Sequence, residues 1–282
     1  MKSGFVAIVG RSNVGKSTLL NTLVGTKIAA TSFRAQMTRH NIHGVLNAPE
    51  GQAVFIDTPG MLKGDKSILT KKLLHKIEEA LSEIDLIVYV VDPSREIGEE
   101  EKAMLALVRH IEKPKILVIN KSDLENEDRK FEEDYDFMSK DFDATFKISA
   151  LRGSHITPLK EKVMEYLPEG EQMYPDDQLT NVDNYFWIAE IIREKAFSIL
   201  NKEIPYSVNV EVEEVKEKDD LLSITAKILT DAERYKKMII GKNASVIKEI
   251  GQLARKELEQ ATNKKVYLDL QVAVDIHWVE RI

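Results

Sequence analysis

The chain has 282 residues, of which 43% are hydrophobic and 31% are charged. This balance is typical of a globular protein and argues against global disorder, and the length favours two domains of roughly 100–200 residues each. The sequence contains no cysteine, which excludes a disulfide scaffold, a thiolate metal site and a cysteine nucleophile. The formal net charge is −7, so a nucleic-acid partner would have to bind a local basic surface.

The first half of the chain alternates short apolar runs with longer amphipathic stretches. Four runs that are nearly continuous in apolar side chains predict strands buried on both faces. They are residues 5–9, 53–56, 84–91 and 115–119. Between them, Leu69, Leu73, Ile77 and Leu81 recur every fourth residue, as on one face of a helix. The alternation predicts an α/β domain over residues 1–170, with a doubly wound and mostly parallel sheet.

The pattern changes after a segment rich in proline and acidic residues, which predicts a linker at residues 171–180. Residues 208–213 and 222–228 then alternate apolar and polar side chains, as in a sheet with one solvated face. We predict a smaller α+β domain over residues 181–282, in the order helix, strand, strand, helix, strand.

Residues 10–17 match the phosphate-binding pattern G-x-x-x-x-G-K-S/T and lie between a predicted strand and a predicted helix. The glycines let successive N–H groups point at phosphate oxygens, and the helix N-terminus favours an anion. Lys16 would reach the β and γ phosphates, and the Ser17 hydroxyl would ligate Mg²⁺. We expect nucleotide contacts from Gly10, Arg11, Ser12, Asn13, Val14, Gly15, Lys16, Ser17 and Thr18.

A base-recognition motif, Asn120-Lys121-Ser122-Asp123, directly follows the last of these strands. The Asp123 carboxylate can accept hydrogen bonds from guanine N1–H and the 2-amino group, neither of which adenine has. Lys121 could lie against the ring, and Asn120 could tie loops together. Residues 149–151, Ser-Ala-Leu, would offer a backbone N–H to the guanine 6-oxo group, so Ser149, Ala150 and Leu151 complete the predicted base site.

Asp57-Thr58-Pro59-Gly60 ends another predicted strand. Asp57 is placed to hold the Mg²⁺ shell through water, and the Gly60 N–H could contact the γ-phosphate. These motifs all follow the carboxyl ends of strands, where ligands bind in open α/β sheets.

Together the motifs resemble the guanine-nucleotide motifs of translation-factor-related GTPases, and residues 33–40 resemble the first switch of the Era group. The resemblance implies that Thr38 supplies a second hydroxyl to Mg²⁺ and that the γ-phosphate orders this switch. Met61 stands where many GTPases carry a water-orienting glutamine, so we expect slow hydrolysis, with Lys16, Thr38 and Gly60 as the catalytic groups. Asn13 matches an asparagine linked to K⁺ coordination in related GTPases; the alternative is a turn asparagine.

Residues 239–251 resemble the centre of a KH domain, in which a G-x-x-G loop between two helices clamps about four nucleotides. The loop here reads Gly-Lys-Asn-Ala, so its fourth position departs from the motif, and a plain helix–turn–helix connection is the alternative. Residues 227–265 hold ten Lys or Arg and five Asp or Glu, which favours an RNA site. We expect RNA contacts from Lys236, Lys237, Ile240, Gly241, Lys242, Asn243, Ala244, Ile247 and Lys248.

Over the whole chain the resemblance is to Era-type GTPases, in which a Ras-like P-loop G domain precedes a type II KH domain. It implies GTP and GDP as ligands, Mg²⁺ as cofactor with K⁺ as a second cation, and small-subunit ribosomal RNA near its 3′ end as partner. It also implies a role in small ribosomal subunit assembly as a monomer in the bacterial cytoplasm. No signal peptide is expected, because the chain begins with a strand-like run.

Two alternatives remain open. One is an RNA-binding scaffold whose nucleotide site has lost turnover, which Met61 favours. The other is a GTPase held at the inner face of the cell membrane by the amphipathic stretch 66–83.

Overall fold

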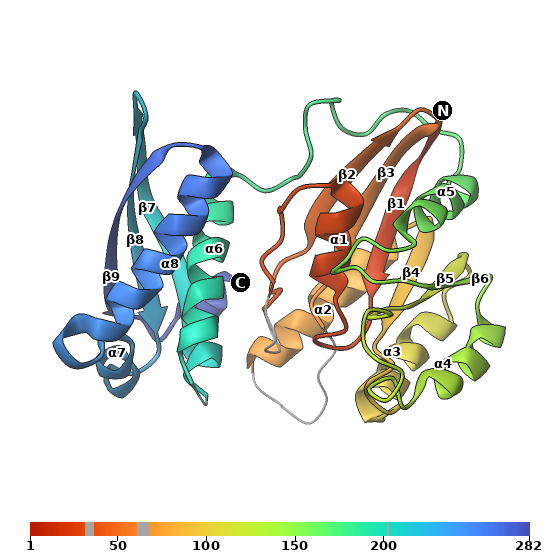
Figure 1. Ribbon diagram of the computed structural model, residues 1–282, viewed down its shortest axis with the longest axis horizontal. Coiled ribbons are helices and arrows are strands. Elements are labelled where there is room, and N and C mark those ends of the chain that lie inside the picture. The colour runs from red at the N-terminus through yellow and green to blue at the C-terminus, as the bar shows by residue number, and fades with distance from the viewer. Residues whose placement is uncertain (32–36, 61–67, 202) are drawn as a thin grey trace. The chain divides into compact units, whose positions relative to one another are not determined.

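The computed structural model describes residues 1–31, 37–60, 68–201 and 203–282. The chain divides into two compact units, residues 1–181 and residues 182–282 (Figure 1). None of the helices in these described ranges is both long enough and apolar enough to cross a bilayer.

The first unit is built on a six-stranded sheet in the order β2-β3-β1-β4-β5-β6. The strands are β1 (Lys2–Val9), β2 (Ile42–Ala48), β3 (Gly51–Asp57), β4 (Leu86–Val91), β5 (Lys115–Ile119) and β6 (Ala144–Lys147). All neighbouring strands are parallel except β2 and β3. The predicted doubly wound α/β sheet is therefore confirmed. The strand predicted at 84–91 begins only at Leu86, because the Asp85 carboxylate instead accepts a hydrogen bond from the Phe5 N–H of β1 (3.0 Å).

Helices cover both faces of this sheet (Figure 1). On one face, α1 (Lys16–Val24) and α5 (Ile156–Tyr166) contact β1 and β3. The other face packs against α2 (Ile68–Ser82), α3 (Glu99–Arg109) and α4 (Glu132–Met138) around the buried ring of Tyr89. The apolar positions of α2 predicted from its four-residue spacing are buried. The helix therefore uses this face in the core, which leaves the membrane alternative without its sequence argument.

Residues 172–181 lie against the outer edge of the sheet instead of forming a free linker. The Val45 N–H of β2 donates to Leu179 O (2.9 Å), and the Gln52 side chain accepts from the N–H groups of Met173 and Tyr174 (2.9 Å each). The boundary between the compact units therefore follows Asn181, at the end of the segment expected to be the linker.

The second unit contains a three-stranded sheet in the order β7-β8-β9, with β7 and β8 antiparallel and β8 and β9 parallel. Its elements are α6 (Asn184–Ile199), β7 (Val208–Lys218), β8 (Leu221–Thr230), α7 (Glu233–Ile240), α8 (Ser245–Thr262) and β9 (Lys265–Val274). Helices α6 and α8 pack against one another and against the sheet. The predicted α+β class is confirmed, but the predicted order lacked α7, the short helix before the Gly-Lys-Asn-Ala loop.

Candidate functional site

The phosphate-binding loop connects β1 to α1, and its lysine is turned onto the loop itself. Lys16 Nζ donates to Gly10 O (3.0 Å) and Arg11 O (2.9 Å), and the side chain is buried. Burial lowers the pKa of Lys16 to about 8. The nearby charges of Asp57 and Glu101 offset this effect only in part, and the printed hydrogen-bond partners are neutral carbonyl oxygens, so this position favours an anionic ligand.

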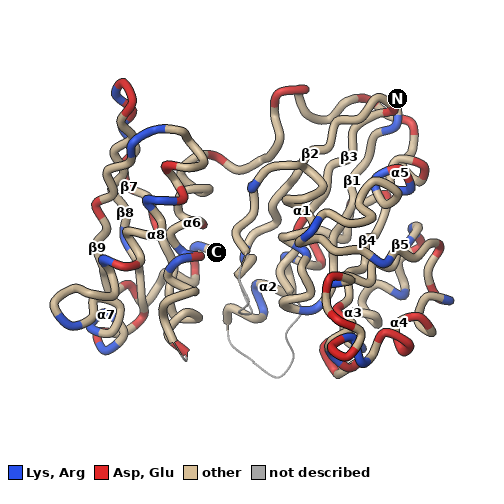
Figure 2. Tube along the Cα trace, viewed as in Figure 1, with Lys and Arg blue, Asp and Glu red and all other residues tan. Residues whose placement is uncertain are grey.

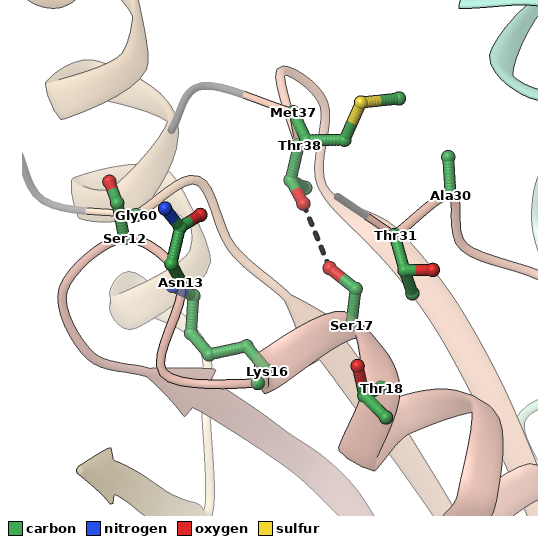
Figure 3. Close-up of a pocket in the computed structure, with 11 residues that line it drawn as sticks. Ser12, Asn13, Lys16, Ser17, Thr18, Ala30, Thr31, Met37, Thr38 and Gly60 are labelled. Carbon is green, nitrogen blue, oxygen red and sulfur yellow. Dashed lines mark hydrogen bonds between the residues drawn. The ribbon is translucent and has the colours of Figure 1, made fainter. Parts of the chain in front are cut away.

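Three oxygen-bearing side chains lie close together near this lysine: Ser17 and Thr38, which Figure 3 shows, and Asp57. Ser17 Oγ donates to Asp57 Oδ2 (2.6 Å) and lies 2.9 Å from Thr38 Oγ1, which also donates to Asp57 Oδ2 (3.3 Å). Burial raises the pKa of Asp57 to about 6, and its second oxygen, Oδ1, is buried and has no hydrogen-bond partner among the described residues. Two hydroxyls and a carboxylate with a spare buried oxygen fit Mg²⁺, which takes oxygen ligands and is bound with one or two carboxylates beside substrate phosphates.

The loop after β3 makes a close approach to the phosphate-binding loop. A Cβ added at Gly60 would lie 2.6 Å from Ser12 Cα, so only glycine fits there. Gly60 is thus at the predicted γ-phosphate end, where it lines one pocket with Asn13, Thr38 and other predicted residues (Figure 3). Met61 and the switch residues 33–36 lie outside the described residues.

The base-recognition motif is joined to the phosphate loop by one amide side chain. Asn120 Nδ2 donates to Val14 O (2.8 Å), and Asn120 Oδ1 accepts from the Ala150 N–H (2.9 Å). Asn120 therefore ties three loops together, as expected. The Ala150 N–H, one of the three backbone N–H groups among which the guanine contact was predicted, is bonded to Asn120 in this structure.

Asp123 and Lys121 of this motif are each held by a side chain of another loop. Ser149 Oγ donates to the Asp123 carboxylate, which fixes its orientation. Lys121 Nζ donates to Asp92 Oδ2 (2.5 Å); burial opposes ionisation of Asp92, but hydrogen bonds from Lys121 and Ser94 lower its pKa overall. Leu151 is 72% exposed beside them. Sequence patterns did not predict Asp92, because it lies far from Lys121 along the chain.

In the second unit, the Gly-Lys-Asn-Ala loop makes the turn between α7 and α8. Gly241 has φ 73°, and an added Cβ would lie 2.6 Å from Val246 Cγ2. Asn243 and Ala244 also have left-handed φ angles, of 53° and 59°. An alanine in this conformation costs roughly 1–2 kcal/mol, so the loop retains a shape that glycine would favour even where glycine is absent.

The predicted RNA residues surround this turn. Lys237, Lys242, Asn243 and Lys248 are exposed, whereas Lys236, Ile240, Gly241, Ala244 and Ile247 are half-buried. Basic residues mark the chain on both sides of the turn (Figure 2). The loop thus presents a small-residue backbone flanked by lysines, the arrangement that a sugar-phosphate chain requires.

A groove between α8 and β9 continues from this loop. Its lining includes two of the predicted residues, Ile247 and Lys248. Its other lining residues were not among the predicted RNA contacts: Gly251, Gln252, Arg255, Val266, Tyr267, Leu268, Asp269 and Leu270. Tyr267 is 61% exposed, so its ring is available to stack on a base.

Comparison with protein families gives two matches. Residues 5–121 match the family described as 50S ribosome-binding GTPase, and residues 203–279 match the KH domain. A protein named GTPase Era from Halothermothrix orenii is 41% identical over 281 residues, covering 99% of this chain and 95% of that protein. The protein of that name from Thermoanaerobacter pseudethanolicus is 44% identical over 285 residues, covering 98% and 92%.

Two solved structures match the whole chain. One is a crystal structure of Era in complex with MgGDPNP and nucleotides 1506–1542 of 16S ribosomal RNA, with a TM-score of 0.92 and 37% identity over 100% of this chain and 96% of that one. The other is a variant of Aquifex aeolicus Era bound to GDP and aluminium fluoride, with a TM-score of 0.91 and 36% identity over the same shares.

Proposed function

Because this chain belongs to the GTPase Era family, we propose that it is a switch protein that binds Mg²⁺–GTP, hydrolyses it slowly to GDP and binds RNA through its KH domain. The observation that carries the nucleotide part is the Asn120 side chain, which joins the phosphate loop at Val14 to the base loop at Ala150. This link supports the proposal, because the loop expected to bind phosphate and the loops expected to bind guanine are joined at one edge of the sheet, as a single nucleotide requires.

The chemistry of the phosphate end follows from its residues. Lys16 would exchange its two carbonyl partners for phosphate oxygens, a stronger, charge-assisted interaction. Ser17, Thr38 and Asp57 would hold Mg²⁺, directly or through water, and the metal would neutralise charge on the β and γ phosphates. Met61 supplies no group that orients the attacking water, so hydrolysis depends on this positioning and is slow.

K⁺ is proposed as a second cation beside Asn13, which lines the phosphate pocket. Positive charge near the bond between the β and γ phosphates would stabilise the transition state, as an arginine finger does in other GTPases. Replacing K⁺ with Na⁺ at equal ionic strength should then lower the rate of hydrolysis. Equal rates in both salts would remove K⁺ from the account.

For RNA, we propose single-stranded small-subunit ribosomal RNA near its 3′ end, and a role in small-subunit assembly as a cytoplasmic monomer. The proposal is supported by the crystallised relative that holds 16S nucleotides and by the loop and groove at α8. The lysines would meet phosphates, and the groove would hold bases along β9.

The test is an anisotropy titration of a labelled RNA with this 3′-end sequence, in the presence of a GTP analogue, GDP or no nucleotide, together with single-turnover GTP hydrolysis. We expect tighter RNA binding in one nucleotide state, and coupling requires RNA to favour that nucleotide by the same factor. Binding of RNA without any hydrolysis would instead favour the scaffold alternative. Hydrolysis without RNA binding would favour a GTPase that acts elsewhere.

A further inference from the structure

The loop between β4 and α3, residues 92–98, is in contact with the base end of the nucleotide site. Asp92 is 1% exposed, and its Oδ2 accepts the hydrogen bond from Lys121 Nζ. Its Oδ1 accepts from the Ser94 N–H (3.0 Å) and from Ser94 Oγ (2.7 Å). One carboxylate therefore shapes the loop with one oxygen and holds the base-site lysine with the other.

Two arginines, one from each loop, connect residues 92–98 to the phosphate loop by hydrogen bonds. Arg95 Nη1 donates to Ser12 O in the phosphate loop (2.9 Å). Arg11 Nη1, from the phosphate loop, donates to Glu96 O (2.8 Å). Each loop thus supplies a guanidinium and a carbonyl to the other, and the pair of contacts restrains both sliding and rotation.

The Arg95 contact has a direct consequence for phosphate binding. The structure has no cis peptide bond in its described residues, so Ser12 C=O and Asn13 N–H point in opposite directions across one trans peptide. Holding Ser12 O toward Arg95 therefore turns the Asn13 N–H away from Arg95, and Asn13 is one of the residues that line the phosphate pocket.

Both the phosphate loop and residues 92–98 are anchored to helices of the same domain. Arg11 Nε lies 3.2 Å from Glu101 Oε2 of α3, and both side chains are almost fully buried. Tyr135 of α4 donates its hydroxyl to Arg95 O (3.1 Å). Residues 92–98 are consequently held to α4 at Arg95, and the phosphate loop is held to α3 at Arg11.

We propose that residues 92–98 act as a strut that sets the position of the phosphate loop relative to the guanine motif. Asp92, Arg95 and Arg11 are positioning residues in this arrangement, since the nucleotide would touch Lys121 and the phosphate-loop amides instead. The inference rests on the proposed binding of guanine nucleotides, which it deepens. It requires the two ends of the strut to be energetically coupled.

The experiment measures GDP affinity by calorimetry for the full chain and for Arg95→Ala, Asp92→Asn and the double variant. Each single change removes hydrogen bonds to a charged group, so each should weaken GDP binding roughly tenfold. Releasing one end of a strut already frees the loop, so the double variant should lose much less than the product of the two single effects. Arg109→Ala is the matched control, because Arg109 is a 76% exposed arginine on α3 whose Asp141 partner is distant at 3.9 Å; it should bind GDP as the parent chain does.

Arg95→Lys should recover most of the affinity lost in Arg95→Ala, because it restores a cationic donor toward Ser12 O. If residue 95 contributed only to stability, the loss of GDP affinity would instead correlate with the decrease in the unfolding midpoint, and a cationic donor at this position would not restore it. If Asp92→Asn does not fold, Ser94→Ala is used in its place. This change removes the hydroxyl hydrogen bond to Asp92 and leaves the charge of Asp92 intact. Unchanged affinity in the single variants, or losses that multiply in the double variant, would overturn the strut. Absence of GDP binding to the parent chain would instead overturn the proposed function.

Discussion

The most informative perturbation of the fold is Arg11→Met, which removes the positive partner of a buried carboxylate. Glu101 is fully buried, and besides Arg11 it contacts the hydroxyl of Tyr89 (2.6 Å) and that of Tyr135 (3.4 Å), whose proton it shares with Arg95 O (3.1 Å). Breaking a buried ion pair on one side costs roughly 3–5 kcal/mol, because the remaining charge is uncompensated. The two tyrosine hydroxyls still solvate Glu101, so we expect a loss of about 3 kcal/mol, the lower end of that range.

The loss should depend on pH in a defined direction. Burial raises the pKa of Glu101 even with Arg11 beside it, and removal of Arg11 raises it further. Between the two pKa values, Glu101 is protonated in the folded variant but ionised in the unfolded chain, where its pKa is about 4.3. The loss in the free energy of unfolding is therefore largest above the raised pKa of Glu101 in the folded variant. It decreases as the pH falls toward the pKa of Glu101 in the unfolded chain.

Hydrogen exchange of the β1 and β4 amides is the appropriate assay. Both tryptophans, Trp187 and Trp278, belong to the second unit, so tryptophan fluorescence would not report on this site. The double variant Arg11→Met/Glu101→Gln removes both charges and should recover most of the lost protection. The reasoning would be refuted if the single and double variants lost equal protection from exchange, or if the loss of protection increased as the pH is lowered.

Three further predictions concern the proposed ligand sites. Burial raises the pKa of Asp57 to about 6, so Mg²⁺-dependent GTP affinity should be strong at about pH 7 and fall by about pH 5, where the carboxylate is protonated. Calorimetry with and without EDTA measures this dependence. A contribution of Mg²⁺ that does not change with pH would contradict it. Gly60→Ala places a methyl 2.6 Å from Ser12 Cα and should abolish single-turnover GTP hydrolysis while GDP still binds; normal hydrolysis would count against the close approach. Ala244→Gly relieves a left-handed alanine and should stabilise the second unit by about 1 kcal/mol in denaturation followed by tryptophan fluorescence; a destabilised variant would refute the assigned strain.

The strongest local patterns in the sequence predicted the fold class well. The buried strands β1, β3, β4 and β5 are nearly uniform in apolar residues, so their identity was evident. β2 was missed because His43, Gly44 and Asn47 interrupt any alternation, and the strand is defined by its antiparallel pairing with β3. The helix α7 is only eight residues long, and its boundary depends on the turn at Gly241.

The chemistry of the site was predictable only where it lies in contiguous motifs. Lys16, Ser17 and Asp57 were assigned because each motif fixes its residues by spacing, and the structure brings all three together. Asp92 and Arg95 were not assigned to the site, because their partners Lys121 and Ser12 are distant in the sequence. Only the folding of the sheet brings each residue close to its partner. The edge pairing of residues 172–181 escaped for the same reason, because a proline-rich acidic segment has no local feature that predicts a partner.

Nucleotide selectivity tests the central claim most directly. Calorimetry of the full chain with Mg²⁺ should show GDP and GTP binding far more tightly than ADP and ATP, since only guanine offers N1–H and a 2-amino group to the Asp123 carboxylate that Ser149 orients. Equal affinity for the guanine and adenine nucleotides, or no binding of either, would contradict the account.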